Sequence, residues 1–321
     1  MSDLNNTASA AEFNSADTFW IPADATDPIR IEESAEAEIA ENDSLGEKII
    51  SMFKKNKVAL ASAIIIVLYI FMAIFAPLVA PYDPNMVDTD ACLQNPTMQH
   101  LLGTDEFGRD ILSRLIYGSR VSLVVGLLPT TISMVIGTVM GLLAGFIGGK
   151  VDFIIMRIAD VLLAFPSLLL AMLVAYTIGT GMLTIFLALA VVGWAGTARI
   201  VRSQTLSLRE KEYVEAATSL GVKRSTIIFR HILPNCLPSL IVLFTTNVPG
   251  NILSESSLSF LGCGAQPPST SWGLMIYRNK KYLSATPVAT LCPGVMIMIL
   301  VLAFNFLGDA LRDIIDPYMK D

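Results

Sequence analysis

Apolar residues in this chain gather in six long runs that are separated by short polar segments. The runs predict membrane-spanning helices at residues 58–80, 121–148, 154–178, 182–198, 233–254 and 287–307. A helix rises about 1.5 Å per residue, so roughly 20 apolar residues cross a bilayer core of about 30 Å. The pattern therefore predicts an all-α integral membrane protein with six transmembrane helices.

Composition agrees with this pattern. Hydrophobic residues make up 53% of the chain and charged residues only 16%, which excludes an ordinary soluble domain. The net charge of −6 is unevenly placed, because residues 1–47 contain twelve acidic residues and a single basic residue, Arg30. So acidic a segment buries too little apolar surface to order its backbone. We expect residues 1–47 to form a disordered tail, followed by a basic membrane domain at 48–321.

Basic residues indicate which loops face the cytoplasm. Lys54, Lys55 and Lys57 directly precede the first apolar run. Seven more basic residues crowd the loop between the fourth and fifth runs: Arg199, Arg202, Arg209, Lys211, Lys223, Arg224 and Arg230. Because cytoplasmic loops carry an excess of lysine and arginine, the loop at 199–232 and both chain ends are expected in the cytoplasm. The loops at 81–120 and 255–286 then face outward.

The basic loop contains a short predicted helix. Residues 209–220 are rich in Glu, Ala, Leu and Lys, which favour a helix, and Gly221 can adopt the left-handed conformation that ends one. Ala216 and Ala217 give this helix a small-residue face, with the carboxylate of Glu215 at its edge. We predict that the helix is a docking knob for another protein.

This loop resembles the EAA loop of bacterial ABC importer permeases, whose pattern is E-A-A, three residues, G and, after nine more residues, I-x-L-P. The matching residues are Glu215, Ala216, Ala217, Gly221, Leu233 and Pro234. His231 stands where the pattern has Ile, and Ile232 follows one place late. The resemblance implies a coupling helix that sits in a cleft of a cytoplasmic ATPase.

Two segments of the predicted outer loops limit the resemblance to one group of these permeases. Residues 103–110 read G-T-D-E-F-G-R-D, and this motif and the stretch at 254–273 are similar to the C-type permeases of dipeptide, oligopeptide and nickel importers. Within the motif, Asp105, Glu106 and Asp110 are expected in turn and capping roles rather than in acid–base catalysis. From Asp110 onward, apolar residues recur at helical spacing and predict a short helix lying flat on the membrane surface.

The resemblance also implies how such a chain would work. It would be a permease subunit in the bacterial inner membrane, forming half of a pathway for solutes that an extracytoplasmic binding protein delivers. Its expected partners are a second permease subunit, two cytoplasmic ABC ATPases that hold ATP and Mg, and membrane lipid, but no nucleic acid. No cofactor, metal or catalytic residue is expected in this chain itself.

The substrate remains open at this stage. Short peptides are the first expectation, and nickel or another small solute is the alternative. An ion-coupled secondary transporter is a further alternative, but such transporters normally place ionisable residues at mid-membrane, and the centres of the predicted spans lack them.

Several residues inside the predicted spans suggest packing or a pathway. Gly137, Gly141 and Gly145 recur every four residues and predict a face on which another helix packs closely. In the third span, Pro166 predicts a kink, and Arg157 and Asp160 lie three residues apart, so that they can form an ion pair.

The fifth span has polar residues in its outer half. Asn247 and Asn251 either line a water-filled pathway or form hydrogen bonds between helices, and the sequence favours neither. Cys92 and Cys263 both fall in predicted outer loops, where a disulfide is chemically possible.

Overall fold

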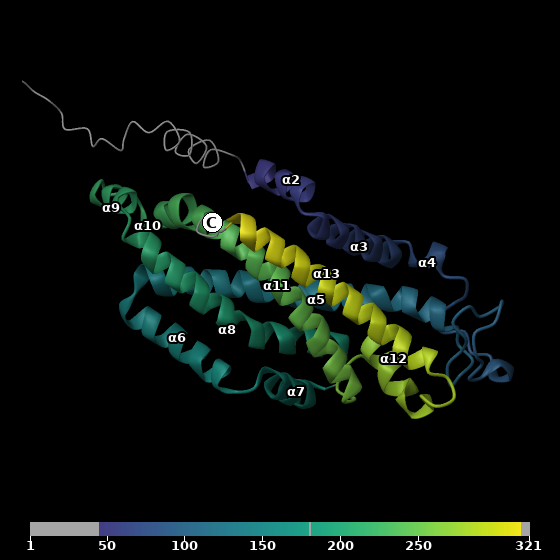
Figure 1. Ribbon diagram of the computed structural model, residues 1–321. Helices are drawn as coiled ribbons and strands as arrows, with labels where there is room; N and C mark the ends of the chain where they lie inside the picture. Colours follow the sequence, from purple (N-terminus) through teal and green to yellow (C-terminus); the bar gives the residue numbers. More distant parts are fainter. Residues whose placement is uncertain (1–44, 180, 316–321) are drawn as a thin grey trace, which may run out of the picture. The chain divides into compact units, whose positions relative to one another are not determined.

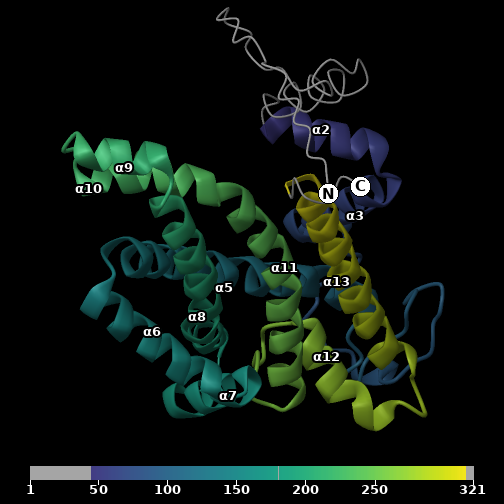
Figure 2. The same ribbon diagram turned by 60° about the vertical axis from the view of Figure 1, so that its left-hand side comes forward.

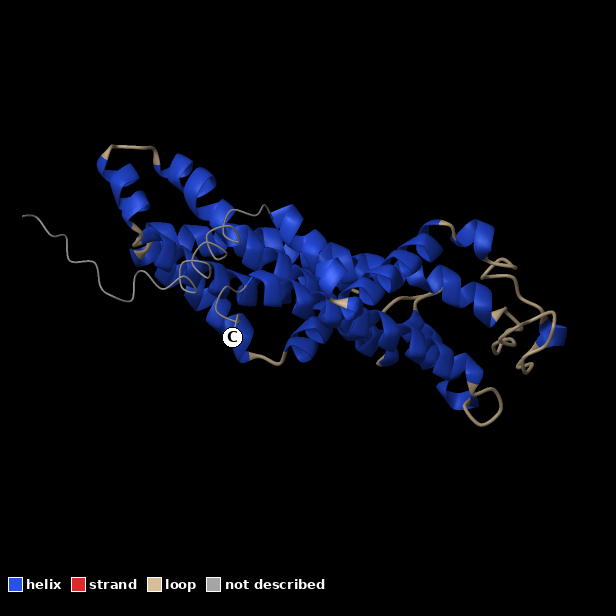
Figure 3. Ribbon diagram, turned by 45° about the horizontal axis from the view of Figure 1, so that its top comes forward, coloured by secondary structure: helices blue, strands red, loops and turns tan. Residues whose placement is uncertain are grey.

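The computed structural model describes residues 45–179 and 181–315. Helices dominate these residues, and they contain no strand (Figure 1, Figure 3). The chain divides into two compact units, residues 1–48 and 49–321. Most of the predicted acidic tail lies outside the described residues, and its last three residues belong to helix α2 (Leu45–Lys55).

Within the described residues, five helices are long and apolar enough to cross a membrane. They are α3 (Lys57–Ile74), α5 (Ile111–Ile147), α8 (Met182–Arg209), α11 (Leu233–Phe260) and α13 (Val288–Ile315). A sixth candidate is the pair α6 (Gly149–Ala164) and α7 (Ser167–Ile178), whose axes are bent by 94°. The predicted all-α membrane architecture is confirmed, with the third span broken in the middle.

The break in the third span follows from Pro166. Proline disfavours the helical conformation of the residue before it, and Phe165 has the extended dihedrals φ −94° and ψ 144°. Pro166 then precedes the first turn of α7. The kink predicted at this proline is a complete break.

Seven short elements connect the long helices. They are α4 (Ala76–Val79), η1 (Thr89–Ala91), α9 (Glu212–Ser219), α10 (Arg224–Ile227), the π-helical turn η2 (Ile228–Ile232), α12 (Trp272–Asn279) and η3 (Lys280–Tyr282). Of these, α9, α10 and η2 join α8 to α11, and α12 and η3 join α11 to α13 (Figure 2).

The prediction of a separate surface helix after Asp110 is wrong. Those residues are the first turns of α5, which begins at Ile111, inside the segment predicted as an outer loop. Two arginines in these turns bind backbone carbonyls of neighbouring segments. The Arg114 guanidinium donates to the Pro84 carbonyl at 2.8 Å, and the Arg120 guanidinium donates to the carbonyls of Ala73 and Ile74 at the end of α3.

Two further loops are shorter than predicted, because the helices beside them are longer. Helix α8 continues to Arg209 rather than ending near 198, and α11 continues to Phe260 rather than to 254. In α8 the extension carries Arg199, whose guanidinium lies 2.7 Å from the Asp160 carboxylate of α6. Paired charges of this kind let a helix run on through a basic segment.

The ion pair that was predicted between Arg157 and Asp160 does not form, because Asp160 has a different partner. Asp160 binds Arg199 across the gap between α6 and α8, while the Arg157 guanidinium lies 5.1 Å from the centroid of the Phe153 ring. Asp152 of α6 likewise binds Arg202 of α8 through both carboxylate oxygens. The charges on α6 therefore connect two helices rather than two turns of one helix.

Helices α5 and α8 pack side by side along the glycines predicted to form a close contact. A Cβ atom built on Gly137 would lie 2.6 Å from Thr197 Cβ, and one on Gly141 would lie 2.6 Å from the Ala198 carbonyl oxygen. Gly145 faces α8 in the same way, near Thr205. The predicted helix-packing role of this face is confirmed.

A hydrophobic core joins α3, α5, α11, α12 and α13. Trp272 is fully buried there, and its indole N–H donates to the Leu115 carbonyl at 3.0 Å. The Tyr69 ring meets the Trp272 ring edge to face, with centroids 5.7 Å apart. Gly118 leaves room for the indole, because a Cβ there would lie 2.8 Å from Trp272 Cδ1.

The loop that precedes α5 is tied together by its acidic residues, as expected from their turn and capping roles. Asp110 caps α5, because its carboxylate accepts from the Ser113 amide at 2.7 Å. The buried Asp105 carboxylate accepts from the amide of Arg109 and lies 3.5 Å from the buried Arg114 guanidinium. These contacts make the motif a structural element rather than an acid–base site.

Glu106 links the same loop to η3. Its carboxylate lies 2.8 Å from the Lys281 ammonium, and this hydrogen bond raises the pKa of Lys281. Cys92 and Cys263 are both free, so the disulfide that was chemically possible is not formed.

A valine at Gly141 is expected to destabilise the protein by about 1–3 kcal/mol, because its side chain would collide with the backbone of α8. Thermal unfolding of the detergent-solubilised chain measures this. Gly294→Val is the matched control, since Gly294 is also helical and a Cβ there meets nothing within 4 Å. Equal stability of the two variants would contradict the close contact between α5 and α8.

Candidate coupling loop and transmembrane recess

The predicted docking knob is helix α9, which stands at one end of the helical bundle with α10 beside it (Figure 1, Figure 2). It is shorter than predicted, since α8 ends at Arg209 and α9 begins only at Glu212. The chain reaches the knob from α8 and leaves it through α10 and η2 into α11. The knob therefore lies between two of the long helices, joined to α8 by a short turn and to α11 through α10 and η2.

Helix α9 ends at Gly221 as predicted. Gly221 has φ +75°, the amide of Gly221 donates to the Thr218 carbonyl at 3.0 Å, and the amide of Val222 donates to the Ala217 carbonyl at 3.1 Å. This pair of bonds is the Schellman motif, which satisfies two of the carbonyls left open at a helix end. A Cβ on Gly221 would meet nothing within 4 Å, so only the backbone conformation demands glycine.

The two faces of α9 differ. Val214 is 1% exposed and anchors the helix in a core cluster shared with α5, α8 and α11, and Ala217 is half-buried against that cluster. Glu215 and Ala216 are exposed. Of the two predicted docking alanines, only Ala216 therefore points away from the protein's own core.

Leu220 completes the exposed surface of α9 and was missed by the sequence analysis. It is 83% exposed, directly before Gly221 at the tip of the knob. Its exposed side chain adds an apolar group to the surface that Glu215 and Ala216 present. The sequence feature that could have pointed to Leu220 is its position directly before the glycine that ends the helix.

The base of the knob explains why Ile232 comes one place late in the motif. In η2 the amide of Leu233 donates to the carbonyl of Ile228, five residues back, so this π turn holds one more residue than an α turn. Ile227 and Ile232 consequently both reach the buried cluster, at 1% and 0% exposure. The extra residue places Ile232, rather than His231, in the core.

The remaining motif residues lie where η2 passes into α11. Leu233 is half-buried against the cluster, and Pro234 is exposed in the first turn of α11. Proline has no N–H group, so it cannot donate to the carbonyl four residues earlier, which suits it to a turn that departs from α geometry. His231 contacts Tyr213 of α9, with ring centroids 6.3 Å apart.

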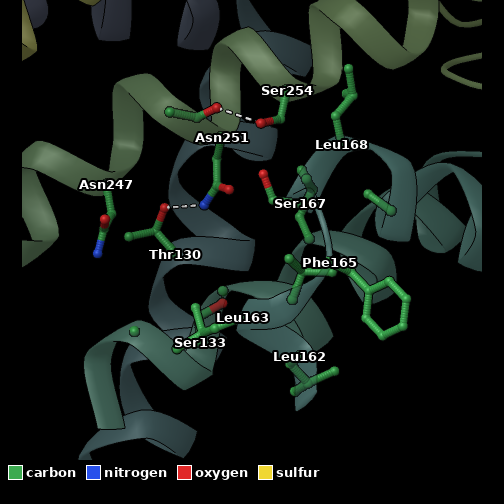
Figure 4. Close-up of a pocket in the computed structure, with 16 residues that line it drawn as sticks. Thr130, Ser133, Leu162, Leu163, Phe165, Ser167, Leu168, Asn247, Asn251 and Ser254 are labelled. Atoms are coloured by element: carbon green, nitrogen blue, oxygen red, sulfur yellow. Dashed lines mark hydrogen bonds between the residues drawn. The ribbon is translucent and has the colours of Figure 1, made fainter. Parts of the chain in front are cut away.

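A recess of about 440 Å³ lies between α5, α6, α7, α8 and α11, next to the break at Pro166 (Figure 4). Both predicted pathway residues, Asn247 and Asn251, line it. The Asn251 amide also donates to the Thr130 hydroxyl of α5 at 2.7 Å. Asn251 thus forms a bond between two helices, which is one of the two roles considered for it, and it also lies in the wall of a cavity.

All sixteen residues that line the recess are uncharged. Its polar groups are the amides of the two asparagines and the hydroxyls of Thr130, Ser133, Ser167 and Ser254. Such a wall can donate and accept hydrogen bonds but cannot neutralise a charge or supply a nucleophile with a base. The recess is suited to passage or binding rather than to catalysis.

Comparison with known proteins identifies the family. The family described as "Binding-protein-dependent transport system inner membrane component" matches residues 137–321, and "N-terminal TM domain of oligopeptide transport permease C" matches residues 44–99. The chain belongs to the family of binding-protein-dependent transport system inner membrane components. The permease is accordingly a multi-pass inner membrane protein.

Curated relatives are similar to the permease both in sequence and over most of their length. It is 44% identical over 267 residues to the dipeptide transport system permease protein DppC of Alkalihalophilus pseudofirmus, covering 83% of this chain and 88% of the relative. It is 39% identical over 303 residues to the oligopeptide transport system permease protein OppC of Bacillus subtilis, covering 91% and 98%. It is 43% identical over 269 residues to the glutathione transport system permease protein GsiD of Pectobacterium atrosepticum, covering 84% and 89%.

A solved structure supports the fold of the permease. An inward-facing MetNI methionine ABC transporter matches with a TM-score of 0.54 and 20% identity, covering 64% of this chain and 97% of that chain. The family expected from the loop at 199–232 and from the motif at 103–110 is confirmed by these comparisons.

Proposed function

We propose that this chain is one of two permease subunits that form the membrane pathway of an ATP-driven importer of short peptides. The observation that carries the proposal is the knob α9, which ends at Gly221 and lies in the connection between two helices that line the recess, α8 and α11. Relatives named as dipeptide, oligopeptide and glutathione permeases support the substrate class.

The proposed partners follow from the surfaces of the chain. A cytoplasmic ABC ATPase docks on α9 through Glu215, Ala216 and Leu220, and a second ATPase serves the second permease subunit. These ATPases hold ATP and Mg, since the stretch 144–151 of this chain departs from a phosphate-binding loop at Ala144 and Val151. An extracytoplasmic binding protein delivers the substrate, and lipid surrounds the apolar helices.

In the proposed mechanism the chain carries out no chemical step. When ATP brings the two ATPases together, they move α9, and the short connections to α8 and α11 pass this motion to the walls of the recess. Gly221, Leu233 and Pro234 fix the shape of the knob and its base, and Ala217 and Val214 hold it to the core. Asn247 and Asn251 line the pathway.

Nickel or another small solute is the second candidate, and an ion-coupled transporter is the third. Nickel prefers imidazole, thiolate or carboxylate ligands, and none of these lines the recess. An ion-coupled transporter needs an ionisable group on the pathway, which the recess also lacks. The uncharged wall therefore favours peptides over both alternatives.

Uptake by a strain in which the gene is deleted tests the function. Complementation with this chain should restore uptake of labelled short peptides and leave uptake of radioactive nickel unchanged, because the recess offers hydrogen bonds but no metal ligands. A strain complemented with an empty vector is the control. Restored nickel uptake without peptide uptake would refute peptides as the substrate.

The coupling role predicts a specific defect for changes at the tip of α9. Leu220→Asp should weaken retention of the ATPase by roughly 2 kcal/mol, about 30-fold, because it removes an exposed apolar anchor without touching the core. Gly221→Val should also uncouple transport through a backbone penalty of roughly 1–2 kcal/mol, whereas Gly221→Asn, which tolerates positive φ, should do so less.

ATPase co-purification and peptide uptake in reconstituted vesicles measure this defect, and levels in the membrane should stay normal. Met98→Asp is the control, since Met98 is 95% exposed and lies in the first outer loop. Full coupled uptake by both Leu220→Asp and Gly221→Val would remove α9 from the coupling role.

The proposed orientation places both chain ends, the acidic tail at 1–47 and the loop that carries α9 in the cytoplasm. In a Cys92→Ser background, Met98→Cys should react with an impermeant thiol reagent on intact cells, and Ser207→Cys should not. Both positions are exposed in the structure, so access to the reagent depends on the side of the membrane. Permeabilised cells are the control for Ser207→Cys, and labelling of this variant in intact cells would reverse the topology.

A further inference from the structure

Two glycines in the wall of the recess have no packing reason to be glycine. Gly196 of α8 and Gly250 of α11 both line the recess, and a Cβ built on either meets nothing within 4 Å. Neither has a positive φ, and glycine weakens a helix relative to alanine. They differ from Gly137 and Gly141, where a Cβ would collide with the neighbouring helix.

Because Gly196 and Gly250 have no side chain, they leave additional space in the recess. Gly196 and Gly250 come from two different helices, so the recess is widened from two sides. Gly193 lies one turn from Gly196 and also lines the recess, but a Cβ there would lie 2.7 Å from the Ser133 hydroxyl oxygen. Gly193 is therefore a packing glycine, and only the other two are free to set the width of the recess.

The wall around this space presents hydrogen-bonding groups without charge. Amides at Asn247 and Asn251 and hydroxyls at Ser133, Ser167 and Ser254 surround the recess, with apolar side chains such as Phe165 between them (Figure 4). Peptide groups are both donors and acceptors, so they can pair with such groups whatever side chains the peptide carries. A volume of about 440 Å³ is within the range of small-molecule sites.

We propose that the recess is a subsite for the main chain of the transported peptide, and that Gly196 and Gly250 set the largest side chain it admits. This inference rests on the proposed function as a peptide permease. It assigns two tasks to different groups: the amides and hydroxyls bind the main chain without selecting for charge, and the two glycines limit size.

Uptake by the reconstituted complex, with both permeases, both ATPases and the binding protein, tests the size limit. The substrates are tripeptides Gly-X-Gly in which X is Gly, Ala, Leu or Trp. Gly196→Leu and Gly250→Val should keep uptake of the Gly and Ala peptides and lose about tenfold or more for the Leu and Trp peptides, since a filled pocket discriminates by size. Gly294→Val is the matched control, an equally unpacked helical glycine outside the recess, and should behave like the wild type.

A charge placed in the recess tests the neutral wall. Asn247 is exposed in the recess, so Asn247→Asp should raise the ratio of Gly-Lys-Gly to Gly-Glu-Gly uptake several-fold over that of the wild type. The binding protein is the same in every sample, so its own preference cancels in this comparison.

The outcomes separate this inference from the function on which it rests. Failure of the wild-type complex to carry any of the peptides would refute the proposed function. Wild-type uptake combined with an equal loss of all peptides in Gly196→Leu, or with loss of the second permease subunit from that variant on purification, would overturn the size limit. An unchanged Lys to Glu ratio in Asn247→Asp would overturn the subsite.

Discussion

Helices α5 and α8 approach each other so closely along Gly137, Gly141 and Gly145 that no side chain fits between them. In a membrane, where lipid is as apolar as the helix surface, such close backbone contact is a main source of helix association. The contact holds α8 against α5 from Trp194 to Thr205. At its end the Arg209 guanidinium donates to the carbonyls of Gly145 and Phe146, so the start of the coupling loop is held against the end of α5.

The third span depends on the same helix pair. Helix α6 is joined to α8 by Asp152 with Arg202 and by Asp160 with Arg199, while α7 packs on α8 beyond the break. Because the span is broken at Pro166, α6 and α7 point in different directions, and the recess lies beside that break. A straight third helix would lie against its neighbours along its length, so the broken one is what leaves space in the bundle.

Long apolar runs, the glycine contact, the break at Pro166 and the end of α9 at Gly221 were all predictable, because each depends on local chemistry or on simple periodicity. The errors have a common cause, which is that contacts distant in sequence override local signals. Arg120, at the end of the predicted outer loop, lies inside α5 and binds carbonyls of α3, and Asp160 pairs with Arg199 rather than with Arg157. Ile232 reaches the core because η2 is π-helical, which residue spacing alone does not reveal.

The placement of α9 suggests how a small movement at the knob reaches the recess. Helix α8 carries Gly193 and Gly196 and leads into α9, and α11 carries Asn247, Gly250 and Asn251 and follows η2. Val214, Ile227 and Ile232 pack in one buried cluster with side chains of α5 and α8, so the knob and both helix ends share one packed core. A cluster packed at interior density transmits displacement instead of absorbing it. On the proposed function, that displacement reaches the recess through its polar links between helices, which are the Asn251 to Thr130 bond between α11 and α5 and the bond from the Ser133 hydroxyl of α5 to the Ala190 carbonyl of α8.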